Sequence, residues 1–405
     1  MSGRLVISVD AMGGDSGPGP ILAGLARTLQ SLPDLRFIVH GDEAALSRQL
    51  SRRRFSALRA HVELRHTEDV VRMDDKPSRA LRERRQSSMW ATLETVKAGD
   101  ALVAVSCGNT GALLAMSTLI LRKAPGIDRP AIAVHWPSRA PHGFTTVLDV
   151  GADLRAGPRT LMQYAVMGAE YARLSFQLAR PRIGFLNVGT EPTKGPADVQ
   201  LAAATAAAAA EATPDLFEHG GFVEGTDIAA ASVDVVVTDG FTGNIALKTA
   251  EGTASFIRDG LREAFEYSIL SRLGSLFALT SLSRLRKRID PRRVNGGVFL
   301  GLNGTVVKSH GRADAVGVEA AMRLAARLAE HDIGDAVHQQ LARLDLTKLP
   351  HGHGSAHTLP HGHSEAGSLY PTDTGDRTGN GGTVPDKAAS PSAAAQSVTG
   401  SGEGS

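Results

Sequence analysis

Six short polar segments each follow an apolar run, and each mixes glycine with Asp, Asn, Thr or Ser. Glycine lets the backbone approach a ligand closely, and a helix that begins after such a segment offers unpaired N–H groups to an anion. One segment alone is equally typical of an ordinary turn followed by a helix cap. Six of them favour a phosphate-binding site, with the candidate contacts Gly13, Gly14, Thr110, Gly111, Asp149, Asn187, Asp239, Thr242 and Asn244.

Three further residues are candidates for a catalytic part. Asn109 can donate hydrogen bonds to an anion, while Lys308 and His310 share one segment and could bring positive charge to it or protonate a leaving group. The alternative is that His310 has a purely structural role. The carboxylates of Asp10 and the other strand-end aspartates would repel phosphate, so we expect them to orient donors, with a bridging Mg²⁺ as the alternative.

Several familiar site types are missing from the sequence. No G-x-G-x-x-G follows the first apolar run, and no G-x-x-x-x-G-K-[ST] occurs anywhere, which counts against dinucleotide and P-loop sites. The single cysteine, Cys107, excludes an intramolecular disulfide and a cysteine-rich metal centre. The segment 14–18 resembles the nucleophile segment of trypsin-like proteases, but its α/β surroundings make that interpretation poor.

The elements that must position these residues alternate along the chain. Short β-branched runs predict strands at residues 6–9, 37–39, 102–105, 131–134, 145–148, 183–186, 233–237 and 305–308. Ala- and Leu-rich stretches predict helices at 20–31, 78–98, 110–122, 158–176, 195–213, 244–266 and 312–330. This alternation predicts an α/β fold with an open, mainly parallel sheet and helices on both faces. Because carboxyl ends of parallel strands share one edge, the six segments should converge there.

Composition places the protein among soluble enzymes. The 405 residues are 42% hydrophobic and 21% charged, with a net charge of +2, which excludes a polycationic nucleic-acid binder. The first apolar run is too short for a signal peptide, and no uncharged apolar stretch reaches transmembrane length. We therefore expect a cytoplasmic protein, with peripheral membrane association left open.

Two regions differ from the rest. Residues 254–293 alternate apolar residues with arginine at helical spacing, which predicts a basic amphipathic helical pair for an anionic membrane, an acidic partner or a dimer interface. Residues 346–405 are rich in Gly, Ser, His, Pro and Thr and predict a disordered tail after a domain of residues 1–345. The tail histidines could bind a transition metal weakly, or they could simply be solvated.

The motifs together resemble one enzyme family. The runs IxVDAMGGD at 7–15, SxGNTGA at 106–112, GIDRPA at 126–131, LDVGA at 148–152, LNVGTE at 186–191, VTDGFTGN at 237–244 and KSHG at 308–311 resemble the PlsX family of phosphate acyltransferases, over residues 4 to 330. Cys107 and Gln86 depart from the family pattern, as does the tail. The resemblance implies a fold similar to isocitrate and isopropylmalate dehydrogenases and to phosphate acetyltransferases, and a homodimer.

The resemblance also implies an activity, which is reversible transfer of a fatty acyl group from acyl carrier protein to inorganic phosphate for phospholipid synthesis. A thioester is exchanged for an acyl phosphate, so neither ATP nor another cofactor or metal is expected. The implied partners are the acidic carrier protein and a membrane glycerol-3-phosphate acyltransferase. Cys107 could form an acyl-cysteine or be a small packed residue. A metal- and NAD-dependent decarboxylating dehydrogenase and a noncatalytic membrane-surface adaptor are the alternatives.

Overall fold

A single twisted sheet of eleven strands organises the chain. The computed structural model describes residues 5–268 and 296–350. Across the sheet the strands run in the order β3 (Val62–His66), β2 (Arg36–Gly41), β1 (Val6–Asp10), β4 (Val103–Ser106), β11 (Thr305–Lys308), β10 (Gly297–Leu300), β5 (Ala131–Pro137), β6 (Phe144–Leu148), β9 (Val235–Val237), β7 (Arg182–Leu186) and β8 (Glu218–Val223). Most pairs are parallel, so the α/β fold class is confirmed.

Three antiparallel pairs in the middle reverse the direction of the sheet. β10 is antiparallel to both β11 and β5, and β5 is antiparallel to β6. The strands from β3 to β11 therefore run opposite to those from β6 to β8. The six polar segments do not share one edge, as a uniformly parallel sheet would require, and that part of the sequence prediction is wrong.

The strand register nevertheless brings the two groups of strand ends to one level. Lys308, the last residue of β11, pairs with Gly297 of β10. Val298, which follows Gly297 in β10, pairs with Ala133 of β5. Ala133 pairs in turn with Leu148, the last residue of β6. The carboxyl ends of β11 and β6, which run in opposite directions, therefore lie at neighbouring levels of the sheet. The polar segments after these two strands both start near the middle of the sheet.

Alternating side chains build two cores, one on each face of the sheet. Val103 and Val105 point to one core, while Ala104 between them points to the other. The helices that contribute to the first core are α1 (Pro18–Leu29), α2 (Glu43–Leu50), α6 (Pro158–Phe176), α7 (Ala197–Ala212), α11 (Ala315–Ala329) and α12 (Ile333–Ala342). The second core is covered by α3 (Pro77–Glu83), α4 (Ser88–Lys97), α5 (Thr110–Ile120), α8 (Gly225–Ala230) and the start of α9 (Gly240–Glu266).

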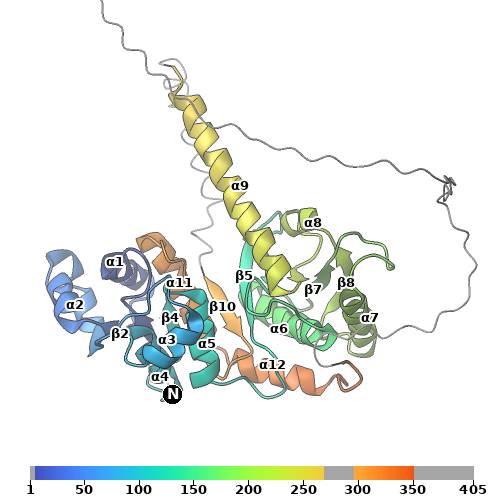
Figure 1. The fold of residues 1–405 in the computed structure, drawn as a ribbon, viewed down its shortest axis with the longest axis horizontal. Coiled ribbons are helices and arrows are strands. Elements are labelled where there is room, and N and C mark those ends of the chain that lie inside the picture. Colours follow the sequence, from blue (N-terminus) through green and yellow to red (C-terminus); the bar gives the residue numbers. More distant parts are fainter. Residues whose placement is uncertain (1–4, 269–295, 351–405) are drawn as a thin grey trace, which may run out of the picture. The chain divides into compact units, whose positions relative to one another are not determined.

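Helix α9 differs from the others because most of its length is exposed among the residues that the structure describes. Figure 1 shows it rising from the region between α5 and α8. Gly240 and Gly243 are its buried residues, whereas Phe256 is 80% exposed. This helix covers the start of the predicted amphipathic pair, and the remainder of that pair, 269–293, lies outside the described residues. No helix in the described ranges is long and apolar enough to cross a membrane.

Some element boundaries differ from the sequence prediction. The expected helix 78–98 is two helices, α3 and α4, because residues 84–87 turn between them and Ser87 caps α4 by accepting from the Trp90 N–H. At the carboxyl end, Leu346 and Leu349 are buried and belong to the first core. The packed chain therefore continues past position 345, and the expected tail from 351 onward lies outside the described residues.

Candidate active site

Asp10, at the end of β1, fixes the first polar segment. Its Oδ1 accepts from the Ser88 hydroxyl at 2.6 Å and from the Gly13 N–H at 3.0 Å, and its Oδ2 accepts from the Ser106 hydroxyl at 2.6 Å. The carboxylate is buried and is occupied by donors from three segments. Asp10 orients the surrounding loops, as expected because its negative charge would repel phosphate. The sequence did not identify Ser88 and Ser106 as its partners.

Gly13 and Gly14 allow three segments to touch. A Cβ on Gly13 would overlap the Asp10 carboxylate and lie 2.8 Å from the Gly108 nitrogen. Gly14 has a φ of 96°, and a Cβ there would lie 2.8 Å from the Gly311 carbonyl oxygen. The Asp15 N–H donates to that same oxygen at 2.8 Å. The segments after β1, β4 and β11 therefore form one continuous surface.

Lys308 is the cation of this surface. It is buried, and its Nζ donates to the carbonyl oxygens of Ser309 and, at 3.4 Å, of Cys107. Burial lowers the pKa of Lys308 to about 8. The ammonium is thus held without a carboxylate in hydrogen-bond contact among the described residues, which leaves its charge available to an anion.

Cys107 lies beneath the same loops and is buried. Desolvation raises the pKa of its thiol to about 11, although Lys308 opposes the shift. The thiol is therefore protonated at neutral pH and is a poor nucleophile. This favours the interpretation of Cys107 as a small packed residue over an acyl-cysteine.

His310 follows Lys308 on the exposed side of the loop. Its Nδ1 accepts from the Arg312 N–H at 3.2 Å, so Nε2 carries the ring proton when the imidazole is neutral. Partial desolvation lowers the pKa of His310. Its part as a proton donor stays a prediction.

Asn109 caps α5 and ties down a neighbouring loop. Its Oδ1 accepts from the Ala112 N–H at 3.0 Å, while its Nδ2 donates to the carbonyl oxygens of Met73 at 3.0 Å and Asp75 at 2.9 Å. The side-chain amide is fully used within the protein. The first N–H groups of α5, at Thr110 and Gly111, have no partner within the helix, and such N–H groups are donors that suit an anion.

We expect Asn109→Ala to lose both of these contacts. Loss of a helix cap costs about 1 kcal/mol of unfolding free energy, and release of the 72–75 loop should lower activity as well. Asn109→Asp keeps an acceptor for the cap but cannot donate to the loop, so it should recover stability more than activity. Urea unfolding and initial rates measure the two effects, and unchanged stability in the alanine variant would contradict the capping part.

A second cluster lies at the end of β6. Asp149 is fully buried, and its oxygens accept from the N–H groups of Ile132 at 3.0 Å, Gly151 at 3.0 Å and Asp153 at 2.7 Å. Desolvation raises the pKa of Asp149 to about 6, although these N–H donors oppose the shift. The carboxylate is turned into its own loop, so it shapes the site rather than facing a phosphate.

The start of α9 packs on this cluster. Asp239 caps the helix by accepting from the Thr242 N–H at 2.7 Å, and it also accepts from the Thr242 hydroxyl at 3.2 Å. Asn244 lies beside Gly151, whose ideal Cβ would be 3.8 Å from the Asn244 Oδ1. The structure therefore brings together four predicted residues, Asp149, Asp239, Thr242 and Asn244.

Helix α9 also connects this cluster to the first one. Lys248, two turns into the helix, is near enough to contribute to the lowered pKa values of Lys308 and His310, and Glu251 acts on His310 in the opposite sense. Asn187 stands apart. Its Nδ2 donates to the Lys194 carbonyl oxygen at 2.9 Å, and no contact within the described ranges joins it to either cluster.

Solved structures of two phosphotransacetylases have a similar fold. The EutD phosphotransacetylase from Staphylococcus aureus superposes with a TM-score of 0.50 at 18% identity, over 81% of this chain and 95% of that one. A phosphotransacetylase from Streptococcus pyogenes matches with the same TM-score, identity and coverage. At this identity the likeness establishes the fold, an α/β architecture that phosphotransacetylases share.

Sequence comparison establishes the family. A family model described as fatty acid synthesis protein matches residues 5–335. The phosphate acyltransferase of Ruegeria sp. (strain TM1040) is 57% identical over 339 residues, which cover 84% of this chain and 89% of that protein. That of Jannaschia sp. (strain CCS1) is 58% identical over 340 residues, covering 84% and 91%. The chain belongs to the PlsX family of phosphate acyltransferases, as its motifs indicated, and it is an acyltransferase.

Proposed function

We propose that the protein transfers a fatty acyl group from acyl carrier protein to inorganic phosphate, reversibly, and so supplies acyl phosphate for phospholipid synthesis. The observation that carries this proposal is the contact of three polar segments around the buried Lys308, next to the open start of α5. A cation and unpaired N–H groups side by side suit a dianion such as phosphate.

The chemistry requires positioning more than proton removal. A phosphate oxygen attacks the thioester carbonyl carbon, the carbon–sulfur bond breaks, and the departing thiolate takes a proton. Phosphate is already a nucleophile at neutral pH, so the protein has to hold it and stabilise the developing oxyanion. Lys308 and the first N–H groups of α5 would bind phosphate, and His310 would protonate the thiolate. One activated acyl group replaces another, so this reaction uses no ATP.

Hydroxylamine trapping tests the proposal. The full chain is incubated with palmitoyl-carrier protein and phosphate, and acyl phosphate is measured as the hydroxamate. We expect product only when phosphate is present. If folded protein forms none, the proposed donor and acceptor are wrong. Reduction of NAD with hydroxyacids would instead support the dehydrogenase alternative, which the names of the relatives disfavour.

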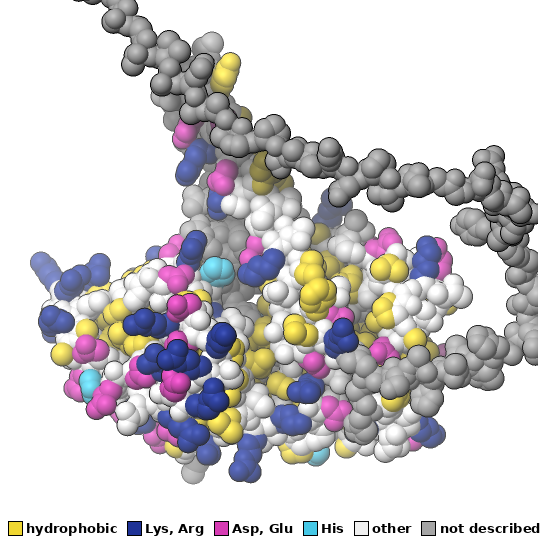
Figure 2. All heavy atoms as spheres, in the orientation of Figure 1, with side chains coloured by type: hydrophobic (Ala, Val, Ile, Leu, Met, Phe, Trp, Pro, Cys, Tyr) yellow, Lys and Arg dark blue, Asp and Glu magenta, His cyan; other side chains and the backbone are white. Residues whose placement is uncertain are grey.

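Basic side chains next to the site suit an acidic carrier protein. Figure 2 shows Lys and Arg side chains gathered over the region where Figure 1 places α3 and α4. Lys76, Arg79, Arg82 and Arg85 are exposed there, directly after the 72–75 loop that Asn109 holds. We propose this surface as the entrance for the carrier protein, in addition to the arginines of the amphipathic pair.

Charge reversal at this entrance should weaken carrier binding. We expect the double variant Lys76→Glu with Arg82→Glu to raise KM for acyl-carrier protein about tenfold, most strongly at low salt, with kcat little changed. KM for an acyl-pantetheine thioester, which lacks the protein, should stay the same. The matched control is Arg52→Glu with Arg53→Glu, after α2. An equal rise in KM for both double variants would contradict a specific entrance.

Helix α9 exposes several apolar side chains, which suits a homodimer. Phe256, Ile257 and Leu261 are 80%, 52% and 41% exposed on this one helix. Burial of such side chains is favourable, so we propose that a second copy covers this face in a homodimer. The arginines of the basic amphipathic pair, predicted at 254–293, would bring this dimer to the membrane surface, where a membrane glycerol-3-phosphate acyltransferase takes the product. This implies a cytoplasmic protein with peripheral membrane contact.

A further inference from the structure

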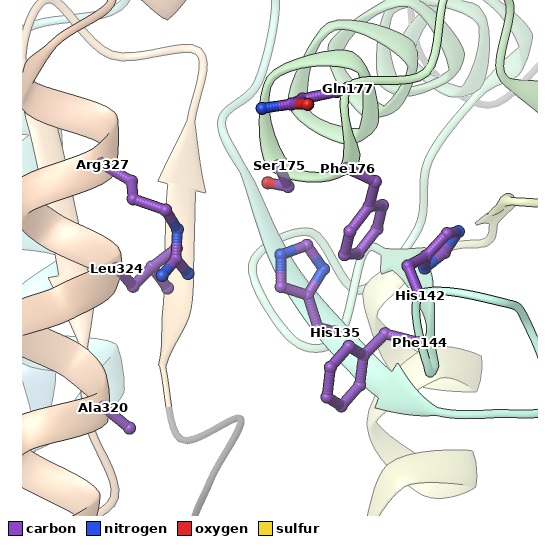
Figure 3. Close-up of a pocket in the computed structure, with 9 residues that line it drawn as sticks. All are labelled: His135, His142, Phe144, Ser175, Phe176, Gln177, Ala320, Leu324 and Arg327. Atoms are coloured by element: carbon purple, nitrogen blue, oxygen red, sulfur yellow. The ribbon is translucent and has the colours of Figure 1, made fainter.

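A cavity of about 390 Å³ lies on the face of the sheet opposite α9. Figure 3 shows that α11 forms one wall and the carboxyl end of α6 forms another, with further lining residues from β5 and from residues 142–144. Helix α6 belongs to one half of the sheet and α11 to the other, so the cavity bridges the two halves. None of the polar segments of the candidate active site lines it.

Three buried ring nitrogens of the cavity have no hydrogen-bond partner within the described residues. His135 is nine-tenths buried, with Nδ1 3.3 Å from the Thr146 hydroxyl and Nε2 unpartnered within the described residues. Both ring nitrogens of His142 are likewise buried and unpartnered there. Burial lowers the pKa of His135 to about 3, so its ring is neutral and offers one N–H. Buried polar groups are normally paired, which indicates an absent partner.

Arg327 gives the cavity a positive charge. Its guanidinium extends from α11 toward His135 (Figure 3). Arg327 is exposed at the rim, no ion pair of it with an acidic side chain is found in the described part of the chain, and the lining contains neither Asp nor Glu. A cation at the wall of a cavity without a carboxylate is complementary to an anionic ligand.

The rest of the lining is aromatic and aliphatic. The ring of His142 stacks on Phe176 with centroids 4.0 Å apart, and His135 lies 4.6 Å from the same ring. Phe144 and Leu324 complete this apolar part. A ligand seated here therefore has an apolar body as well as an anionic end, and the volume is within the usual range for small-ligand sites.

We propose that this cavity binds a small carboxylate with a compact apolar body, whose carboxylate pairs with Arg327 and accepts from His135 while its body packs on Phe176. Short fatty acids and arylacetic acids share this chemistry. Because such a ligand touches α6 and α11 together, it holds the two halves of the sheet to each other. The proposal is independent of the transferase reaction.

Calorimetric titration of the full chain tests this site. The probes are hexanoate and phenylacetate, with hexylamine and phenethylamine as partners of the same shape and opposite charge. We expect at least one acid to bind and neither amine to bind. Arg327→Gln should weaken binding of that acid at least tenfold, since a charge-assisted hydrogen bond is lost. Comparing the two acids tells whether the body is aliphatic or aromatic.

Three further variants locate the binding. Ala320→Leu fills the cavity from α11 and should abolish binding. Arg323→Gln removes a charge from the same helix one turn away, outside the lining, and should bind normally. Lys308→Met should also bind normally, because it alters the candidate active site alone. No binding of either acid, equal binding of the amines, or unchanged affinity in Arg327→Gln would overturn the proposal.

Discussion

Lys308→Met is expected to lower kcat/KM for phosphate by about two to three orders of magnitude. The buried ammonium lies where the loops after β1, β4 and β11 meet, and it donates to the carbonyl oxygen of Cys107, three residues before α5 begins. Methionine keeps the length of the side chain and removes the charge, so the loss reports electrostatic stabilisation of phosphate and of the developing oxyanion. Initial rates at varied phosphate measure it.

Lys97→Met is the matched control, because Lys97 ends α4 on the surface. It should keep wild-type rates. If Lys308→Met retained activity within threefold of the wild type, with the phosphate KM unchanged, Lys308 would have no part in binding the nucleophile. Unfolding curves for both variants separate loss of activity from loss of fold.

The pH dependence of the wild type follows from the same lysine. Burial lowers the pKa of Lys308 to about 8, so its charge is lost as pH rises through that value, and kcat/KM should fall there. The contribution of Lys308 to the free energy of unfolding instead increases as pH rises. Between about pH 8 and the unfolded value near 10.4, the unfolded chain binds more protons, so this group makes folding more favourable as pH rises. A falling rate without unfolding, absent from Lys308→Met, is the expected result.

Gly243→Ala is expected to reduce the free energy of unfolding by about 3 kcal/mol or more. Gly243 is buried where α9 crosses the loop after β6, and a Cβ there would overlap the carbonyl oxygen of Asp149. Neither backbone can move without disturbing the N–H groups that hold the Asp149 carboxylate. The overlap costs strain, displaces the start of α9, and should lower activity as well.

Gly252→Ala provides the comparison within the same helix. Gly252 is exposed, and nothing lies within 4 Å of a Cβ placed on it. Alanine is the better helix former by about 1 kcal/mol, so this variant should be as stable as the wild type or more so. Chemical denaturation of both variants checks the pair, and equal stability would show that the loop after β6 yields easily.

The sequence predicted the strands other than β3, β8 and β10, and it predicted the polar segments, because each of these carries its own local signal. Val103 to Val105 read as a buried strand, which the structure contains as β4. For Asn109 the structure contains the alternative, an ordinary helix cap. What these segments contact could not be read in the same way. The hydroxyl of Ser88 reaches Asp10 from 78 positions away, and no spacing rule encodes that distance.

The direction of the strands was beyond local reasoning as well. Periodicity identifies a strand but not its orientation in the sheet, so the reversal at β10 and β5 was missed. Asn109 was expected to face phosphate, yet its amide is occupied by Met73 and Asp75. Residues 72–75 carry no sequence motif that predicts their contact with Asn109. The catalytic parts of Asn109, Lys308 and His310 stay predictions.

The place of β10 and β11 in the sheet has a consequence for the order of events during synthesis. These two strands lie between β4 and β5, although about 150 residues or more separate them along the chain. Until the ribosome has released residue 308, β4 and β5 each present an open edge to solvent, and open edges are prone to wrong pairing. A nascent chain cannot complete its sheet gradually from the amino end. Lys308 is in the last strand of the described chain, so the residue that we propose to bind phosphate and the closure of the sheet come in the same step.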